Sequence, residues 1–248
     1  MMSQLKSEFK KLFTVKSTYY IIAIVLLLVF FFAFYISGWR IEPKDMMNPL
    51  TLQSGITGAV SVVSIFSALV ALLLVTHEYR YNTIMYTLTS SNSRSKVLFS
   101  KIIIMTGFAL VFTLVFGALS PLFTALGIHA HHLHLVHQTI QYNNVIWRCL
   151  FYGWGYTMAG LLIASLVRNQ VGAIITLFIV PGTVEGLLSL LLKKNTVYLP
   201  FSSLHQVIGQ DVSTTSTLSA THAALVFIGY LLAALIVAWV LFLRRDAN

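Results

Sequence analysis

The chain has 248 residues, of which 57% are hydrophobic and only 9% charged, and its mean hydropathy is +0.83. This composition excludes a water-soluble globular protein and predicts an integral membrane protein. At about 20 residues for each membrane span, the length accommodates roughly six helices with short loops, which predicts one all-α transmembrane domain over residues 1–248. The formal charge of +9 does not indicate nucleic-acid binding, because the sixteen basic residues are scattered between apolar segments.

The first 18 residues predict an amphipathic helix that lies in the lipid headgroup layer. Leu5, Phe9, Leu12 and Phe13 recur at helical spacing, with lysines between them. A cleaved signal peptide is the alternative. It is disfavoured because the following apolar run is long enough to span a membrane and no small-x-small cleavage site comes after it. We therefore expect an interfacial helix over residues 1–18, followed directly by the first span.

Six apolar segments are long enough to cross a membrane. They cover approximately residues 19–38, 55–75, 102–126, 146–167, 171–192 and 222–243. With the N-terminus inside, eleven of the sixteen Lys and Arg residues fall on the inner side. Because inner loops carry an excess of Lys and Arg, both termini are expected in the cytoplasm of a multi-pass plasma (inner) membrane protein.

A polar and basic segment between the second and third spans is the expected point of contact with a soluble partner. Thr83 can cap a short helix, and Ile84, Met85 and Leu88 would give that helix an apolar edge. A short amphipathic helix at the cytosolic surface can dock into a groove of another protein. The alternative is a solvated loop that rests on the membrane.

The segment also carries an ordered set of motif residues. They are Glu78 at the end of the second span, Asn82-Thr83, the apolar run Ile84 to Leu88, Ser93-Arg94, and Lys101 opening the third span. This pattern resembles the cytoplasmic loop of ABC-2 type transporter permeases, where a glycine usually stands in place of Asn82. Asparagine also tolerates unusual backbone angles. The N-terminal helix, the six spans and an outer segment containing Leu199-Pro200-Phe201 follow the same order as in that family.

The resemblance implies a permease subunit of an ATP-binding cassette transporter, which exports a substrate. The helix from Thr83 to Leu88 would be a coupling helix on a separate ATP-binding subunit, with Glu78 and Arg94 beside it. That subunit would bind ATP and Mg, since this sequence has no G-x-x-x-x-G-K-[ST] phosphate loop and no cofactor motif of its own. The chain is thus expected to be a transport subunit and not an enzyme. A second permease copy, in a homodimer or heterodimer, membrane lipid, and short outer helices between the fifth and sixth spans are also implied.

Five histidines follow the third span and are candidates for a metal site. They are His129, His131, His132, His134 and His137. Their spacing would allow Zn, Cu or Ni to bind, or pH to be sensed. No Cys or carboxylate lies within the cluster, so we favour a solvated loop and expect no metal.

A possible gate or substrate contact lies in the fifth span, at Pro181 and Glu185. A proline breaks the helical ladder, and a carboxylate is costly inside a membrane. The alternative, which we favour slightly, places Glu185 near the outer surface, where it is solvated or paired with Lys193 or Lys194.

An ATP-independent membrane carrier, or an immunity or sensor-like membrane protein, is the alternative function. Carriers usually place charged groups near the bilayer midplane and often show internal repeats. The spans here are nearly uncharged and show no convincing repeat. The same lack of charge favours a lipid-like, peptide or other amphipathic cargo over a small ion.

Overall fold

The computed structural model describes residues 2–36, 51–83, 94–130, 141–209 and 217–244. Within these ranges every regular element is a helix, which confirms the expected all-α class. Six helical segments are long and apolar enough to cross a membrane: Lys16–Tyr35, Leu52–Arg80, Ser95–Ala130, Asn143–Val167, Gln170–Tyr198 and Ala220–Leu241. Each of them overlaps one predicted span, so the prediction of six spans is confirmed.

A separate first helix, α1 (Met2–Thr14), precedes the spans. The first span is α2 (Lys16–Phe30), which continues as a π-helical turn, η1 (Phe31–Ile36). The next spans are α4 (Thr51–Arg80), α6 (Arg94–Ala130) and α7 (Tyr142–Val167), and the last is α11 (Ala220–Arg244). Both α4 and α6 extend well beyond the predicted ranges 55–75 and 102–126. Their polar ends continue the helix past the apolar run that the prediction counted.

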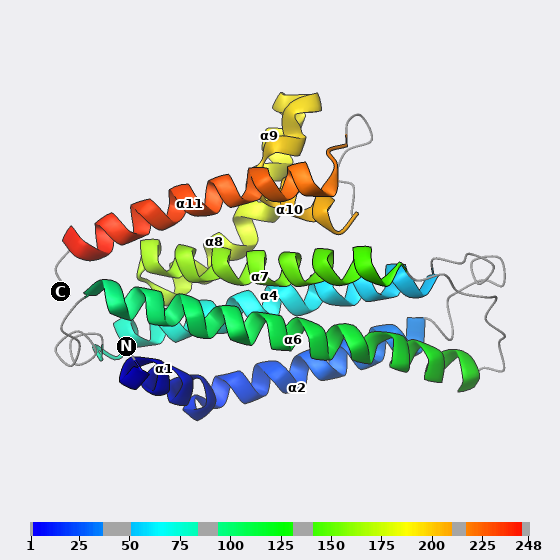
Figure 1. Ribbon diagram of the computed structural model, residues 1–248, viewed down its shortest axis with the longest axis horizontal. Helices are drawn as coiled ribbons and strands as arrows, with labels where there is room; N and C mark the ends of the chain where they lie inside the picture. Colours follow the sequence, from blue (N-terminus) through cyan, green and yellow to red (C-terminus); the bar gives the residue numbers. More distant parts are fainter. Residues whose placement is uncertain (1, 37–50, 84–93, 131–140, 210–216, 245–248) are drawn as a thin grey trace.

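Helix α4 lies inside the bundle and packs along α6 and α7 (Figure 1). Its contact with α7 is close because small residues face each other: a Cβ added to Gly160 would lie 2.6 Å from the carbonyl oxygen of Ala68. Across the same interface, the buried hydroxyls of Ser67 and Thr157 share a hydrogen bond of 2.7 Å. Close backbone approach and polar contacts of this kind hold helices together inside membranes.

The fifth span is interrupted. It consists of α8 (Gln170–Ile179), a π-helical turn η3 (Val180–Val184), α9 (Glu185–Leu192) and a 3₁₀ turn η4 (Lys193–Tyr198). Pro181 lies in η3, where its missing N–H favours a wider turn. After this turn α9 projects away from the bundle, and the chain returns as α10 (Pro200–Val207), which packs against α7 and α11 (Figure 1). Of the short helices expected between the fifth and sixth spans, the described residues contain α10.

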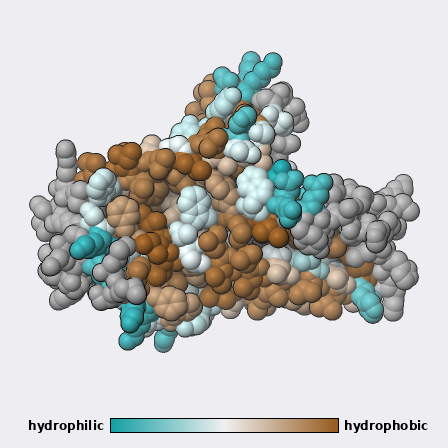
Figure 2. Space-filling view, in the orientation of Figure 1, coloured by the Kyte–Doolittle hydropathy of each residue, from teal (hydrophilic) through white to brown (hydrophobic). Residues whose placement is uncertain are grey.

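Hydrophobic residues cover most of the face shown in Figure 2, and hydrophilic residues gather toward the two ends of the bundle and at the tip formed by α9 and η4. The exposed hydrophobic side chains include Leu27, Val111, Val171, Leu191 and Ile236. A surface of this extent requires a hydrocarbon or protein environment. The chain is a multi-pass membrane protein.

Candidate coupling site

Two of the motif residues, Glu78 and Lys101, meet at the end of the bundle where α1 lies. Glu78 is close to the end of α4, and Lys101 lies near the beginning of α6. The Nζ atom of Lys101 is 2.8 Å from Oε1 of Glu78. This ion pair joins the two helices that flank the expected coupling helix.

Helix α1 contributes two further charges to the same place. Lys101 Nζ lies 2.7 Å from Oε2 of Glu8. Lys11 Nζ lies 2.6 Å from Oε1 of Glu78 and 2.8 Å from Oε1 of Glu8. We refer to Glu8, Lys11, Glu78 and Lys101 as the buried charge cluster. It connects α1, α4 and α6 at one point.

The buried charge cluster is largely withdrawn from solvent. The side chains of Glu8 and Lys101 are each 3% exposed and that of Glu78 is 6% exposed, whereas Lys11 is 32% exposed. The two carboxylates and two ammonium groups balance in formal charge. Burying charges is costly, and the cost is offset only while every partner keeps its geometry. The cluster therefore favours one mutual arrangement of α1, α4 and α6.

The two residues on α1 show how the cluster affects protonation. Burial alone would raise the pKa of the Glu8 carboxyl, but the Lys101 and Lys11 ammonium groups outweigh it and hold this pKa below its ordinary value. Burial alone would lower the pKa of Lys11, but Glu78 and Glu8 outweigh it and raise this pKa above its ordinary value. Both shifts favour the charged forms at neutral pH.

These shifts predict a pH-dependent stability. The Glu8 contribution is fully present above the ordinary carboxyl pKa of 4.5 and is lost as the pH falls through the lowered pKa of the folded protein. The Lys11 contribution is fully present below 10.5 and is lost as the pH rises through its raised pKa. We expect the melting temperature of the detergent-solubilised chain to fall at the acidic end, and Glu8→Gln to reduce that dependence. An acid profile identical in wild type and Glu8→Gln would contradict this.

The predicted coupling residues are described only in part. Thr83 lies in the turn after α4, where its backbone N–H donates to the carbonyl oxygen of Glu78 at 2.9 Å. Asn82 has a φ of +53°, the left-handed conformation that a glycine adopts readily. Ile84, Met85 and Leu88 lie outside the described residues, as does the side chain of Arg94. The coupling helix itself thus stays a prediction.

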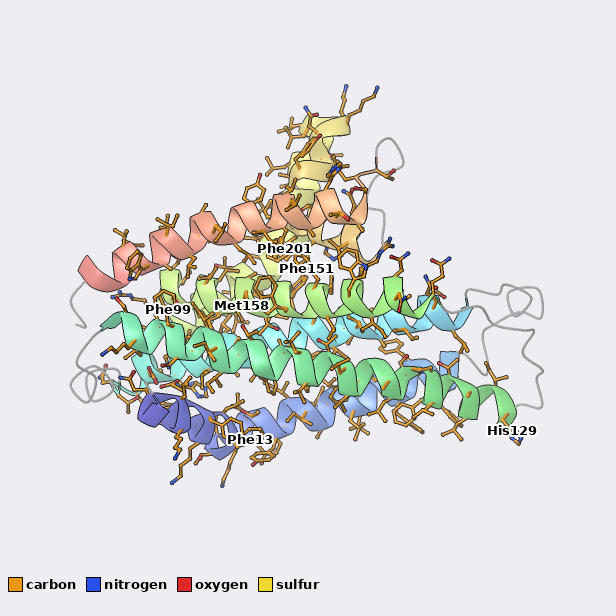
Figure 3. All side chains as sticks on the ribbon, in the orientation of Figure 1. Phe13, Phe99, His129, Phe151, Met158 and Phe201 are labelled. Atoms are coloured by element: carbon orange, nitrogen blue, oxygen red, sulfur yellow. The ribbon has the colours of Figure 1, made fainter. Side chains whose placement is uncertain are left out.

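Sequence reasoning missed Glu8 and the role of Lys11. All the lysines of the first 18 residues were expected to lie among the headgroups, but Lys11 turns inward to the cluster. Leu12 is buried on the inward side, while Phe9 and Phe13 are exposed; Figure 3 shows Phe13 pointing away from the bundle. One signal was available, because Glu8 precedes Leu12 by four residues and shares its helix face.

The second half of the fifth span gives Glu185 a structural partner. Its Oε1 accepts a hydrogen bond of 2.7 Å from the backbone N–H of Phe201. Its Oε2 accepts two more, each of 2.7 Å, from the N–H and hydroxyl of Ser202. Glu185 is only 4% exposed, so the prediction of a solvated glutamate is wrong. Helix α10 folds back, and the carboxylate caps its first turn, where N–H groups lack intrahelical acceptors.

Helix α10 is also fixed by aromatic contacts with α7. The ring centroids of Phe201 and Tyr156 are 5.3 Å apart, and those of His205 and Tyr152 are 5.6 Å apart. Figure 3 shows Phe201 between α10 and the bundle. The chain thus leaves the bundle after the turn containing Pro181. The hydrogen bonds from α10 to Glu185 stabilise the position of α10 against α7.

The histidine cluster is described only at its first member. His129 lies near the end of α6 and, in Figure 3, at the far end of the bundle from α1. His131, His132, His134 and His137 fall outside the described residues. Among the residues that the structure describes, no group of three or more His, Cys, Asp or Glu side chains is placed to hold a metal ion.

Comparison with known proteins identifies the family. A family model described as ABC-2 family transporter protein matches residues 4–184, which is more than half of the chain and includes the whole buried charge cluster. No curated protein matches the chain. The chain belongs to the ABC-2 transporter family and is a membrane permease component of ABC transport.

Proposed function

We propose that the chain is the permease subunit of an ATP-driven exporter, and that a separate ATP-binding subunit holds ATP and Mg and hydrolyses the nucleotide. The family match over residues 4–184 carries this proposal. The sequence has no phosphate-binding loop, so the energy of ATP has to come through a partner. This chain acts as the transport subunit, without ATPase activity of its own.

The buried charge cluster gives the loop after α4 a mechanical connection to the spans. The loop leaves α4 just after Glu78 and enters α6 shortly before Lys101. Because the two residues are ion-paired and α4 packs along α7, a displacement of the loop is passed to several spans at once. An ATP-binding subunit that prefers one loop position therefore biases the permease between states through a coupling free energy.

The remaining elements fit an export path between two permease copies in the plasma (inner) membrane, with both termini cytoplasmic. The Pro181 turn and the α10 helix capped by Glu185 form the outer part of that path. Exposed apolar side chains on α8, α9 and α11, among them Val171, Leu191 and Ile236, would face lipid or the second copy. A lipid-like or amphipathic cargo suits this nearly uncharged surface.

A change at the predicted docking edge tests the proposal. We expect the double variant Met85→Asp with Leu88→Asp to lose the ATP-binding subunit during purification, because two buried charges at a protein interface oppose association strongly. The melting temperature of the permease alone should stay within about 2 °C of the wild type, since the predicted docking edge lies outside the spans and substitutions away from a packed core usually cost little. Co-purification and melting curves measure the two effects.

The matched control is Tyr86→Asp with Thr87→Asp, which adds the same charge to the same predicted helix but away from its apolar edge. This control should retain the partner. Equal loss of the ATP-binding subunit from both double variants would show a general charge effect. Retention of that subunit by both would contradict docking through the predicted edge.

A further inference from the structure

A cavity of about 520 Å³ lies at the α1 end of the bundle, where α4 ends and α7 passes into α8. Its lining includes Arg80 at the end of α4, and Arg168, Gln170, Val171 and Ile174 around the α7–α8 connection. It is separate from the buried charge cluster, none of whose members lines it. The proposed coupling function does not use this cavity.

The two arginines make the cavity strongly basic. Arg80 Nη1 donates to Oε1 of Gln170 at 3.0 Å, which uses one of the five N–H donors of its guanidinium. Arg168 Nη2 donates to the carbonyl oxygen of Leu241 at 3.3 Å, and its guanidinium lies 5.4 Å from the Tyr79 ring centre. No acidic residue is among the described residues that line the cavity. The guanidinium groups are thus held in place beside a cavity that favours an anion.

The beginning of α8 adds to this preference. Asn169 caps the helix by accepting a hydrogen bond of 2.9 Å from the N–H of Gly172. The N–H groups of Gln170 and Val171 belong to the first turn, where no intrahelical acceptor is available. The positive end of the ten-residue helix therefore lies at the cavity beside the arginines.

An apolar strip leads away from the basic cavity along α8. Val171 is 65% exposed and Ile175 is 51% exposed, and Ile174 is partly buried at the cavity wall. Both exposed residues lie within the predicted fifth span, in a helical segment that is long and apolar enough to cross a membrane. A ligand that fills both places therefore needs an anionic group at the cavity and an apolar part along the span.

We propose that this cavity binds the phosphate headgroup of an anionic phospholipid from the inner leaflet, with an acyl chain lying along Val171 and Ile175. The assignment to the inner leaflet rests on the orientation proposed above, with both termini cytoplasmic. An acidic surface of a soluble protein would match the arginines but would not reach the apolar strip, which is why lipid is favoured. Bidentate contact with phosphate oxygens is the preferred geometry of arginine.

Lipid binding by the purified full-length permease alone tests the proposal. Native mass spectrometry in mild detergent would follow the titration of phosphatidylglycerol, with phosphatidylcholine and inorganic phosphate as comparisons. We expect Arg80→Gln with Arg168→Gln to weaken phosphatidylglycerol binding roughly twenty-fivefold, at about fivefold for each cation near a lipid phosphate. Phosphatidylcholine binding should be weak in both proteins. If the double variant fails to fold, Arg80→Gln alone should lower affinity about fivefold.

The matched control is Lys10→Gln with Lys96→Gln, which removes two exposed cations from the same end of the bundle but outside the cavity. It should retain phosphatidylglycerol affinity. Equal loss in the control, equal binding of phosphatidylcholine, or saturation by inorganic phosphate alone would overturn the proposal. So would arginine variants that keep the lipid affinity of the wild type. Because the permease is tested alone, failure here leaves the proposed transport function intact.

Discussion

Replacing Lys101 with methionine is expected to destabilise the permease by about 3–5 kcal/mol, the usual cost of breaking a buried ion pair from one side. Lys101 is bonded to both Glu8 and Glu78, and its side chain is only 3% exposed. Without it, the partly exposed Lys11 is the one cation among the described residues that the two carboxylates still share. The melting temperature of the detergent-solubilised variant measures the loss. Coupled ATPase activity should fall as well, because α4 and α6 would no longer be held together.

The control is Lys96→Met, an exposed lysine on the same helix, which should change stability by less than about 0.5 kcal/mol. A second variant separates charge from packing. Adding Glu78→Gln to Lys101→Met removes one uncompensated carboxylate, so the double variant should recover part of the lost stability. Additive losses in the double variant, or a Lys101→Met protein as stable as the wild type, would contradict the ion-pair interpretation.

Replacing Glu185 with leucine is expected to release α10 and to cost roughly 3 kcal/mol or more, because buried donors without acceptors each cost about 1–3 kcal/mol. Three donors lose their acceptor: the N–H groups of Phe201 and Ser202 and the Ser202 hydroxyl. Hydrogen exchange measures the effect at those amides, whose protection should fall about a hundredfold, equivalent to about 2.8 kcal/mol at 1.4 kcal/mol for each factor of ten.

Two further variants make this test specific. Glu185→Gln keeps one acceptor oxygen and should show a smaller loss of protection than the leucine variant. Ser189→Ala removes a hydroxyl one turn further along the same helix, where it donates to the local carbonyl of Gly186. Exchange in α10 should be unchanged in Ser189→Ala. Unchanged protection of α10 in Glu185→Leu would show that the aromatic contacts with α7 are sufficient to hold it.

The membrane spans could be predicted from sequence because each depends on a local property. A run of about 20 apolar residues fits the hydrocarbon thickness of a membrane, and each of the six predicted runs overlaps a helical segment of the described residues. The predicted C-terminal ends of α4 and α6, at residues 75 and 126, come too early, because the hydrophobic run ends before the helix does. The turn at Asn82 was also local, and its φ of +53° agrees with the expected tolerance for a left-handed backbone.

The charge cluster and the α10 cap depend on contacts between distant parts of the chain. Glu8 and Lys101 are 93 positions apart, and Glu185 and Phe201 are 16 apart. Helical periodicity describes only neighbours three or four residues away, so it could not show that Lys11 turns inward or that α10 folds back. The motif placed Glu78 and Lys101 around one loop but did not show that they bind each other.

The dependence on a separate ATP-binding subunit can be measured by purifying the tagged chain from its native host in mild detergent and identifying co-purifying proteins by mass spectrometry. We expect a stoichiometric ATP-binding subunit whose ATPase activity changes when the permease is bound. Recovery of the permease alone, or with a partner that does not bind ATP, would contradict an ATP-driven exporter.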